Sequence, residues 1–291
     1  MSAPIVAAFN FVDTLALVGT TVGQVDEILM AEDQLHGDAP VVFSDHSVEV
    51  KNVSFGYHDD AEILHAVSLN VPQNSMTALV GPSGSGKTTL CNLVARFWDV
   101  DSGSVRIGGT DVRDYTLESL MDQISMVFQN VYLFADTIEN NIKFGCPDAT
   151  HEQVVEAARR ACCDDFIKAL PDGYDTVIGE GGASLSGGEK QRISIARAML
   201  KDAPIIILDE ATANVDPENE DRLQKAIEAL THEKTVLMIA HRLKTVRGAD
   251  QILVVDGGQI VQQGKHDELI RQPGIYADFV GGKKETTGWK L

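Results

Sequence analysis

The sequence predicts an α/β fold in which helices cover a mostly parallel sheet. A glycine-rich loop at 81–88 stands between an apolar run at 76–80 and a helical pattern at 89–97. Two further apolar runs, 205–208 and 235–240, have the continuous hydrophobicity of parallel strands that are buried on both faces. Each of the three runs leads into polar or glycine residues. Because the carboxyl ends of parallel strands lie at one edge of a sheet, we expect one functional site at that edge.

The loop Gly81-Pro82-Ser83-Gly84-Ser85-Gly86-Lys87-Thr88 fits the pattern G-x-x-x-x-G-K-[ST]. A strand, a glycine-rich turn and a helix N-terminus together aim backbone N–H groups at one small volume, where a phosphate can bind. Glycines allow positive φ angles and a close approach of the backbone to the phosphate. Lys87 would contact the β- and γ-phosphates, and the Thr88 hydroxyl would bind Mg²⁺. The loop therefore predicts a nucleoside-triphosphate site and a P-loop NTPase fold.

Composition limits the class of protein. The chain has 291 residues, 44% of them hydrophobic, and a formal net charge of -19. This length allows one large α/β domain with appendages, and the acidic balance leaves no basic face for nucleic acid. The four cysteines lack metal-ligand spacing, which indicates reduced thiols. With no apolar run long enough to span a bilayer and no signal-peptide pattern, the isolated chain is expected to be soluble.

The N-terminal segment 5–30 has apolar residues three and four apart, which predicts a long helix with one apolar stripe. Asn10 and Asp13 interrupt the stripe too early for a segment that faces lipid. Two interpretations remain open: the helix packs on its own domain, or it is the cytosolic end of a helix that belongs to a larger membrane assembly. The residues at 37–40 then predict a linker.

Further elements follow from local patterns. Tyr57, after the first alternating stretch, either packs against the sheet or stacks on a base. Gln129 ends a later strand. Strands are predicted at 48–55, 63–71, 104–107 and 123–128, and a charged helix at 150–169. A final hairpin joins 251–255 to 259–262.

The stretch Leu185-Ser186-Gly187-Gly188 starts another helix, which continues through 193–200 and has Ser186 as its N-cap. It offers a second helix N-terminus that favours an anion. Since one bound nucleotide rarely needs two such termini from one chain, we expect a dimer. The second terminus of one subunit would cover the γ-phosphate that the loop of the other subunit binds.

Three side chains follow the two other apolar runs. Asp209 and Glu210 come directly after 205–208, and His241 comes directly after 235–240. The Asp209 carboxylate is expected to bind Mg²⁺, and Glu210 is placed to deprotonate an attacking water. His241 can donate a hydrogen bond to the γ-phosphate. Two unrelated surface carboxylates fit poorly, because the apolar run implies burial up to that point.

As a set, Tyr57, the GPSGSGKTT loop, Gln129, LSGGEKQR, IIILDEA and His241 resemble the nucleotide-binding domain of ABC transporters over 41–280. The resemblance implies that Tyr57 stacks on adenine, that Glu210 is the general base and that His241 is the switch histidine. It also implies that Gln129 contacts Mg²⁺ and the attacking water, and that 214–216 is a dimer-interface loop, with Val215 where leucine is usual. The segment 177–182 is similar to that of exporter-type members.

The resemblance implies an organisation and a set of partners. A helical segment at 1–36 would be similar to the end of the last transmembrane helix, with a linker at 37–47 and a flexible tail at 281–291. The ATPase domain at 48–280 would include an antiparallel β subdomain and a helical subdomain at about 130–190. Its ligands would be ATP and Mg²⁺. Its partners would be a transmembrane domain and a second ATPase domain, identical or different, at the cytoplasmic face of the membrane. The C-terminal residues 276–279 and 288–289 resemble those of exporters that handle iron-siderophores, which suggests a siderophore as cargo.

The predicted site residues fall into three overlapping groups. The nucleotide contacts are Tyr57, Gly81, Pro82, Ser83, Gly84, Ser85, Gly86, Lys87, Thr88, Thr89, Gln129, Ser186, Gly187, Gly188 and Asp209. The metal ligands are Thr88, Gln129 and Asp209, and the catalytic residues are Lys87, Gln129, Glu210 and His241.

Three other functions compete with an ATP-driven transporter domain. A soluble ABC-type ATPase of translation or DNA repair would need tandem ATPase domains or a long coiled coil, together with a basic surface, and the chain has none of these. A P-loop kinase gives no reason for the LSGGEKQR stretch. A nucleotide-gated interaction module without turnover stays open, and ATPase activity that rises with the square of protein concentration would separate it from a motor.

Overall fold

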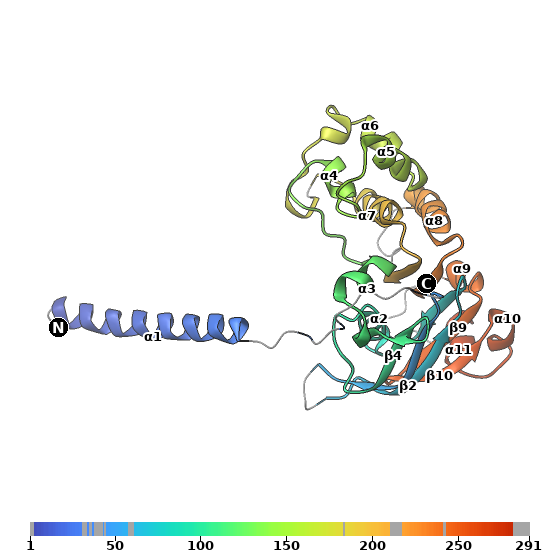
Figure 1. Cartoon of the computed structure of the whole chain (residues 1–291), viewed down its shortest axis with the longest axis horizontal. Coiled ribbons are helices and arrows are strands. Elements are labelled where there is room, and N and C mark those ends of the chain that lie inside the picture. Colours follow the sequence, from blue (N-terminus) through green and yellow to red (C-terminus); the bar gives the residue numbers. More distant parts are fainter. Residues whose placement is uncertain are drawn as a thin grey trace. The chain divides into compact units, whose positions relative to one another are not determined.

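The computed structural model describes residues 3–30, 34, 37, 43, 45–57, 61–182, 184–209, 217–240 and 243–281. The chain divides into two compact units, Met1–Leu35 and His36–Leu291. The described part of the first unit is the helix α1 (Ala3–Leu29), as the apolar spacing predicts (Figure 1). Its apolar side chains that the structure describes, which begin at Phe11, are exposed, Phe11 by 64% and Leu17 by 68%. No helix in the described ranges combines the length and the apolar content that crossing a membrane requires.

A six-stranded sheet forms the centre of the second unit. Its strand order is β10-β9-β3-β8-β7-β6, with only the β9–β10 hairpin antiparallel. The strands are β3 (Met76–Val80), β6 (Ile124–Val127), β7 (Ile205–Asp209), β8 (Thr235–Ile239), β9 (Gln251–Asp256) and β10 (Gln259–Gly264). The predicted mostly parallel sheet and its final hairpin are therefore confirmed.

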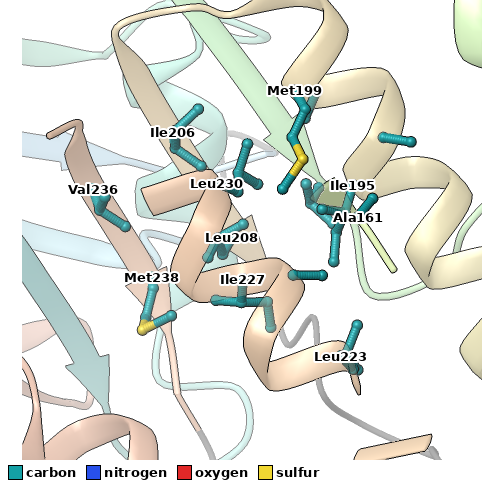
Figure 2. Close-up of a cluster of buried hydrophobic side chains, with 14 of the residues drawn as sticks. Ala161, Ile195, Met199, Ile206, Leu208, Leu223, Ile227, Leu230, Val236 and Met238 are labelled. Carbon is teal, nitrogen blue, oxygen red and sulfur yellow. The ribbon is translucent and has the colours of Figure 1, made fainter. Parts of the chain in front are cut away.

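The side chains of β7 alternate between two hydrophobic cores. Ile206 and Leu208 pack against helices α7 (Gly187–Lys201) and α8 (Pro217–Thr231) on one face of the sheet (Figure 2). Ile205 and Ile207 point to the other core, on the opposite face. Since both faces are covered, every residue of β7 is buried, which explains its uninterrupted apolar sequence.

A second, antiparallel sheet has the order β2-β1-β4-β5. Its strands are β1 (Val48–Phe55), β2 (Leu64–Val71), β4 (Ser102–Ile107) and β5 (Thr110–Asp111). Inward residues such as Val48 and Val50 share a core with Leu90 and Leu93 of helix α2 (Lys87–Val94). This core connects the antiparallel sheet to the phosphate-loop helix, so the two cannot shift independently.

Two predicted helices are wrong in their extent. The helix predicted over 150–169 is two helices, α5 (His151–Arg160) and α6 (Asp164–Lys168), because Cys162 has a φ of 56°. The helix predicted over 89–97 begins at Lys87 and ends at Val94, because Arg96 has a φ of 55°. A residue in the left-handed conformation cannot continue a right-handed helix. Neither position is a glycine, the residue that would have indicated a helix end in the sequence.

The remaining helices complete the second unit. Helices α4, α5, α6 and α7 group together at one end of it (Figure 1), and α4 and α5 both contact α7. Arg197 of α7 donates from Nε to the carbonyl oxygen of Asn141 at 2.9 Å, which ties α7 to α4. The helices not yet bounded are α3 (Leu117–Gln123), α4 (Ile138–Lys143), α9 (Leu243–Arg247), α10 (His266–Leu269) and α11 (Ile275–Val280), and 3-10 turns lie at Val112–Asp114, Gly173–Asp175 and Glu180–Gly182.

Candidate nucleotide-binding site

The loop between β3 and α2 has a backbone that only glycine allows at two positions. Gly81 has a φ of 152°, and a Cβ there would overlap the carbonyl oxygen of Val255. Gly86 has a φ of 102° and precedes the first residue of α2, where a Cβ would lie 2.6 Å from Cδ2 of Leu64. The two glycines therefore let the chain turn tightly from the strand into the helix, which is the local arrangement in which a helix N-terminus can bind a phosphate.

Lys87 is held inside this loop. Its side chain is nearly buried, with 6% of the residue exposed. Its ammonium group donates to the carbonyl oxygens of Gly81 at 2.9 Å and Pro82 at 2.7 Å, and to Oγ of Ser85 at 3.3 Å. A buried charge needs such partners. The ammonium is thus fixed within the turn, where it adds a positive charge to the helix N-terminus.

The end of β7 brings Asp209 to the same place. Asp209 is 8% exposed, and helix α2 contacts β7. Burial raises the pKa of the Cys91 thiol on α2, the nearby Asp209 carboxylate raises it further, and the Lys87 ammonium opposes this. Asp209 and Lys87 thus both act on the Cys91 thiol, and the contact of α2 with β7 brings the end of β7 toward the helix that begins at Lys87.

The donor set fits magnesium. Thr88 offers an exposed hydroxyl at the first turn of α2, and Asp209 offers a carboxylate. In the described ranges no cluster of three His, Cys, Asp or Glu side chains could hold a metal by itself. Mg²⁺ prefers oxygen ligands and binds through one or two protein groups together with water and substrate phosphates. Thr88 and Asp209 would hold it, and it would neutralise charge on the phosphates.

Tyr57 and Gln129 follow strands of different sheets, β1 and β6. The half-buried Tyr57 follows β1, and its hydroxyl lies 3.4 Å from Oγ1 of Thr89 and 3.5 Å from Nδ2 of Asn92. A residue predicted to stack on a base is thereby connected to the residue after Thr88. Gln129 is exposed in the loop that follows β6. Sequence reasoning missed Asn92, because nothing local in the sequence relates a helical asparagine to a tyrosine 35 residues earlier.

The second predicted helix N-terminus is confirmed at α7. Ser186 is the N-cap, and its Oγ accepts from the N–H of Glu189 at 3.3 Å. Glu189 reciprocates, since its Oε2 accepts from the N–H of Ser186 at 2.8 Å. Ser186 and Gly187 are exposed, and Gly188 is buried. The capped terminus is therefore open to solvent, as a surface that meets another molecule must be.

Several predicted site residues lie outside the described residues. These are Glu210, the loop at 214–216 and His241, and the same holds for the tail beyond 281. Their roles remain predictions from the sequence. The described strand ends, Asp209 of β7 and Ile239 of β8, are adjacent in the sheet and pair in register. Glu210 directly follows the first of these residues along the chain.

Residues 64–213, just over half of the chain, match the family described as "ABC transporter". The chain belongs to the ABC transporter family. It is 53% identical over 234 residues to an ATP-dependent lipid A-core flippase of Vibrio cholerae, a match that covers 80% of this chain and 40% of the relative. It is 51% identical over 229 residues to a flippase of the same name from Syntrophus aciditrophicus, covering 79% of this chain and 38% of the relative.

A solved structure extends the match. The fold is similar to that of a bacterial Atm1-family ABC exporter with ATP bound, with a TM-score of 0.83 and 40% sequence identity. That match covers 96% of this chain and 51% of the exporter chain. The second unit is thus an ABC-type ATPase domain of the exporter kind. The chain spans about two fifths of the length of the curated relatives it matches.

Proposed function

We propose that the chain is the ATP-hydrolysing domain of an exporter-type ABC transporter, and that it works as a dimer. The observation that carries this proposal is the presence of two helix N-termini suited to phosphate in one chain. One contains the buried Lys87, and the other is the solvent-exposed terminus capped by Ser186. A head-to-tail pair would place ATP between the first terminus of one subunit and the second terminus of the other.

Within one subunit different residues bind different parts of the nucleotide. Tyr57 takes the base, and the loop Gly81–Gly86 together with Lys87 takes the phosphates. Thr88, Asp209 and Gln129 provide the ligands for Mg²⁺. The fixed ammonium and the helix N-terminus stabilise negative charge without having to rearrange, which is where much of a phosphoryl-transfer rate comes from.

Hydrolysis is assigned to Glu210 from its sequence position. Its carboxylate takes a proton from a water whose oxygen attacks the γ-phosphorus, while the bond from that phosphorus to the β–γ bridging oxygen breaks and ADP leaves. His241 donates a hydrogen bond to the γ-phosphate, and Gln129 orients the water. Loss of the γ-phosphate removes the group that joins the two subunits, so the dimer opens and drives the membrane partner.

The transmembrane partner and the location follow from the same proposal. Helix α1 exposes apolar side chains at intervals from Phe11 to Leu29, which is the property of a helix that is covered in an assembly. We assign it to the cytosolic end of the transmembrane domain, so that the ATPase domain works at the cytoplasmic face of the membrane. The second ATPase domain is either an identical chain or a homologous one.

The cargo is the least constrained part of the proposal. The similar proteins named above are lipid A-core flippases, which favours a large amphipathic lipid. A siderophore, suggested by the C-terminal residues, is the other candidate, and the comparisons do not support it. Reconstitution with the transmembrane partner in vesicles, followed by transport of a labelled lipid and a labelled ferric siderophore, decides between them.

The test of the ATPase proposal uses Glu210→Gln. This variant is expected to bind ATP as the wild type does, to lose turnover and to form a dimer with ATP and Mg²⁺, seen by light scattering. Lys87→Ala is the control that should bind ATP far more weakly than the wild type and stay monomeric. An unchanged hydrolysis rate in Glu210→Gln removes Glu210 as the base, and a variant that stays monomeric at saturating ATP and high concentration removes the dimer.

A further inference from the structure

Tyr57 contacts two aromatic rings and two polar side chains that no motif in the sequence indicates. The Tyr57 ring meets the ring of Phe55 at 5.1 Å between centroids and 85°, and that of Trp98 at 5.3 Å and 82°. Both rings stand nearly perpendicular to Tyr57, so neither stacks face to face on it. The Tyr57 hydroxyl is within hydrogen-bond distance of Thr89 and Asn92 on α2. The orientation of the ring is thereby defined from several sides.

Trp98 belongs to a rigid turn. The chain leaves α2 with Arg96 in a left-handed conformation, and Arg96 is 2% exposed. Its Nε donates to Oδ1 of Asp99 at 2.9 Å, and its Nη1 donates to the carbonyl oxygen of Val112 at 3.2 Å. A buried guanidinium with these partners fixes the turn at 96–101 in one conformation.

The same turn also holds the backbone beside Tyr57. Oδ2 of Asp101 accepts from the N–H of Gly56 at 2.9 Å. The turn thus contacts the segment after β1 twice, once through the Asp101 carboxylate, which accepts from the Gly56 N–H, and once through the Trp98 ring. Trp98 nevertheless remains 49% exposed, whereas the other aromatic neighbour, Phe55, is 3% exposed. The Trp98 ring lies nearer to Tyr57, at 5.3 Å, than to Phe55, at 6.4 Å, and a large aromatic side chain kept at the surface in this way has a role beyond filling the core.

We propose that Trp98 is a positioning residue that holds Tyr57 ready for the nucleotide base. The inference rests on the proposed function, in which Tyr57 stacks on adenine. A ring that is already oriented loses less conformational entropy when a base stacks on it. Aromatic pairs of this geometry contribute an amount that corresponds to about a two- to tenfold change in affinity. Trp98 therefore acts on the base end of the nucleotide, and the phosphate end does not depend on it.

The test compares two ligands that differ in the base. ATP and inorganic tripolyphosphate are titrated, each with Mg²⁺, into the full chain by calorimetry. Trp98→Ala is expected to weaken ATP binding about two- to tenfold and to leave tripolyphosphate binding unchanged. Trp98→Phe keeps a ring and should recover most of the loss. In a Tyr57→Ala background Trp98→Ala should have no further effect, because its role runs through Tyr57.

Phe97 offers a matched control from the same turn. It is 46% exposed and stacks on Phe128 at 6.3 Å instead of contacting Tyr57, so Phe97→Ala should leave the ratio of the two affinities unchanged. A second readout is fluorescence. The chain has two tryptophans, so Trp289→Phe leaves Trp98 as the only tryptophan, and its selectively excited emission should respond to ATP but not to tripolyphosphate.

Two results would overturn the positioning role. In the first, Trp98→Ala weakens ATP and tripolyphosphate equally, which indicates a general loss of structure. In the second, Trp98→Ala has the same effect with and without Tyr57. Failure of the proposed function looks different: the wild type would bind ATP no more tightly than tripolyphosphate, or would bind neither.

Discussion

Ser186 caps a helix and has a second, proposed role at the nucleotide, and one substitution tests the two separately. In a single subunit Ser186 caps α7 through the reciprocal pair with Glu189. In the proposed dimer the same exposed hydroxyl meets the γ-phosphate that the other subunit binds. Asp ranks with Ser as an N-cap and interacts favourably with the helix dipole, so Ser186→Asp should change the free energy of unfolding by only a few tenths of a kcal/mol. Ser186→Ala, which loses the cap, should cost about 1 kcal/mol.

The effect on the dimer is expected to be far larger. A carboxylate about 4 Å from a phosphate charge, at an effective dielectric constant of about 20, is repelled by roughly 4 kcal/mol. This corresponds to about a thousandfold loss of ATP-dependent association, and turnover at limiting protein concentration should fall with it. Ser186→Asn keeps a neutral cap and should be affected much less, so the difference between Asn and Asp measures charge alone.

Two measurements on the same samples check this reasoning. Urea unfolding without nucleotide gives stability, and the ATPase rate as a function of protein concentration gives association. Thr150→Ala is the matched control, because Thr150 caps α5 through the same reciprocal arrangement with Gln153. It should lose about 1 kcal/mol of stability and keep its ATPase activity. If Ser186→Asp hydrolyses ATP at the wild-type rate, Ser186 does not face a phosphate and the head-to-tail dimer is wrong.

Three other predictions follow from the described contacts. Lys87→Ala removes the ammonium held by the loop, so calorimetry should show ATP binding weakened by at least roughly 100-fold with the circular dichroism spectrum retained. Gly81→Ala forces a Cβ onto the carbonyl oxygen of Val255, and thermal unfolding should report a loss of about 3 kcal/mol, against about 1 kcal/mol for Gly84→Ala, whose Cβ would meet nothing within 4 Å. Burial alone would raise the pKa of Asp164, but hydrogen bonds from Lys168 and Tyr174 hold it below its ordinary value. This stability is therefore present above the unfolded-state pKa and is lost as pH falls through the folded-state pKa, so the deficit of Asp164→Asn in urea unfolding at pH 7 should shrink in acid.

The sequence alone predicted the elements whose signal is local. The loop between β3 and α2, the cap at Ser186 and the hairpin of β9 and β10 each depend on a few neighbouring residues, and the structure confirms all three. The two uninterrupted apolar runs at β7 and β8 were also recognisable as strands in the sequence, because strands covered on both faces need no polar positions. The predicted chemistry of the site depends on where these runs end.

Only the tertiary structure decided which segments meet. The sheet order β10-β9-β3-β8-β7-β6 departs from chain order, so no local pattern contains it. The ends of α2 and α5 depend on left-handed backbone at Arg96 and Cys162, residues with no intrinsic preference for it, and surrounding contacts hold them there. The contact of Trp98 with Tyr57 joins positions far apart in sequence. Periodicity and turn chemistry are properties of neighbouring residues, whereas packing depends on the partner that the fold brings near.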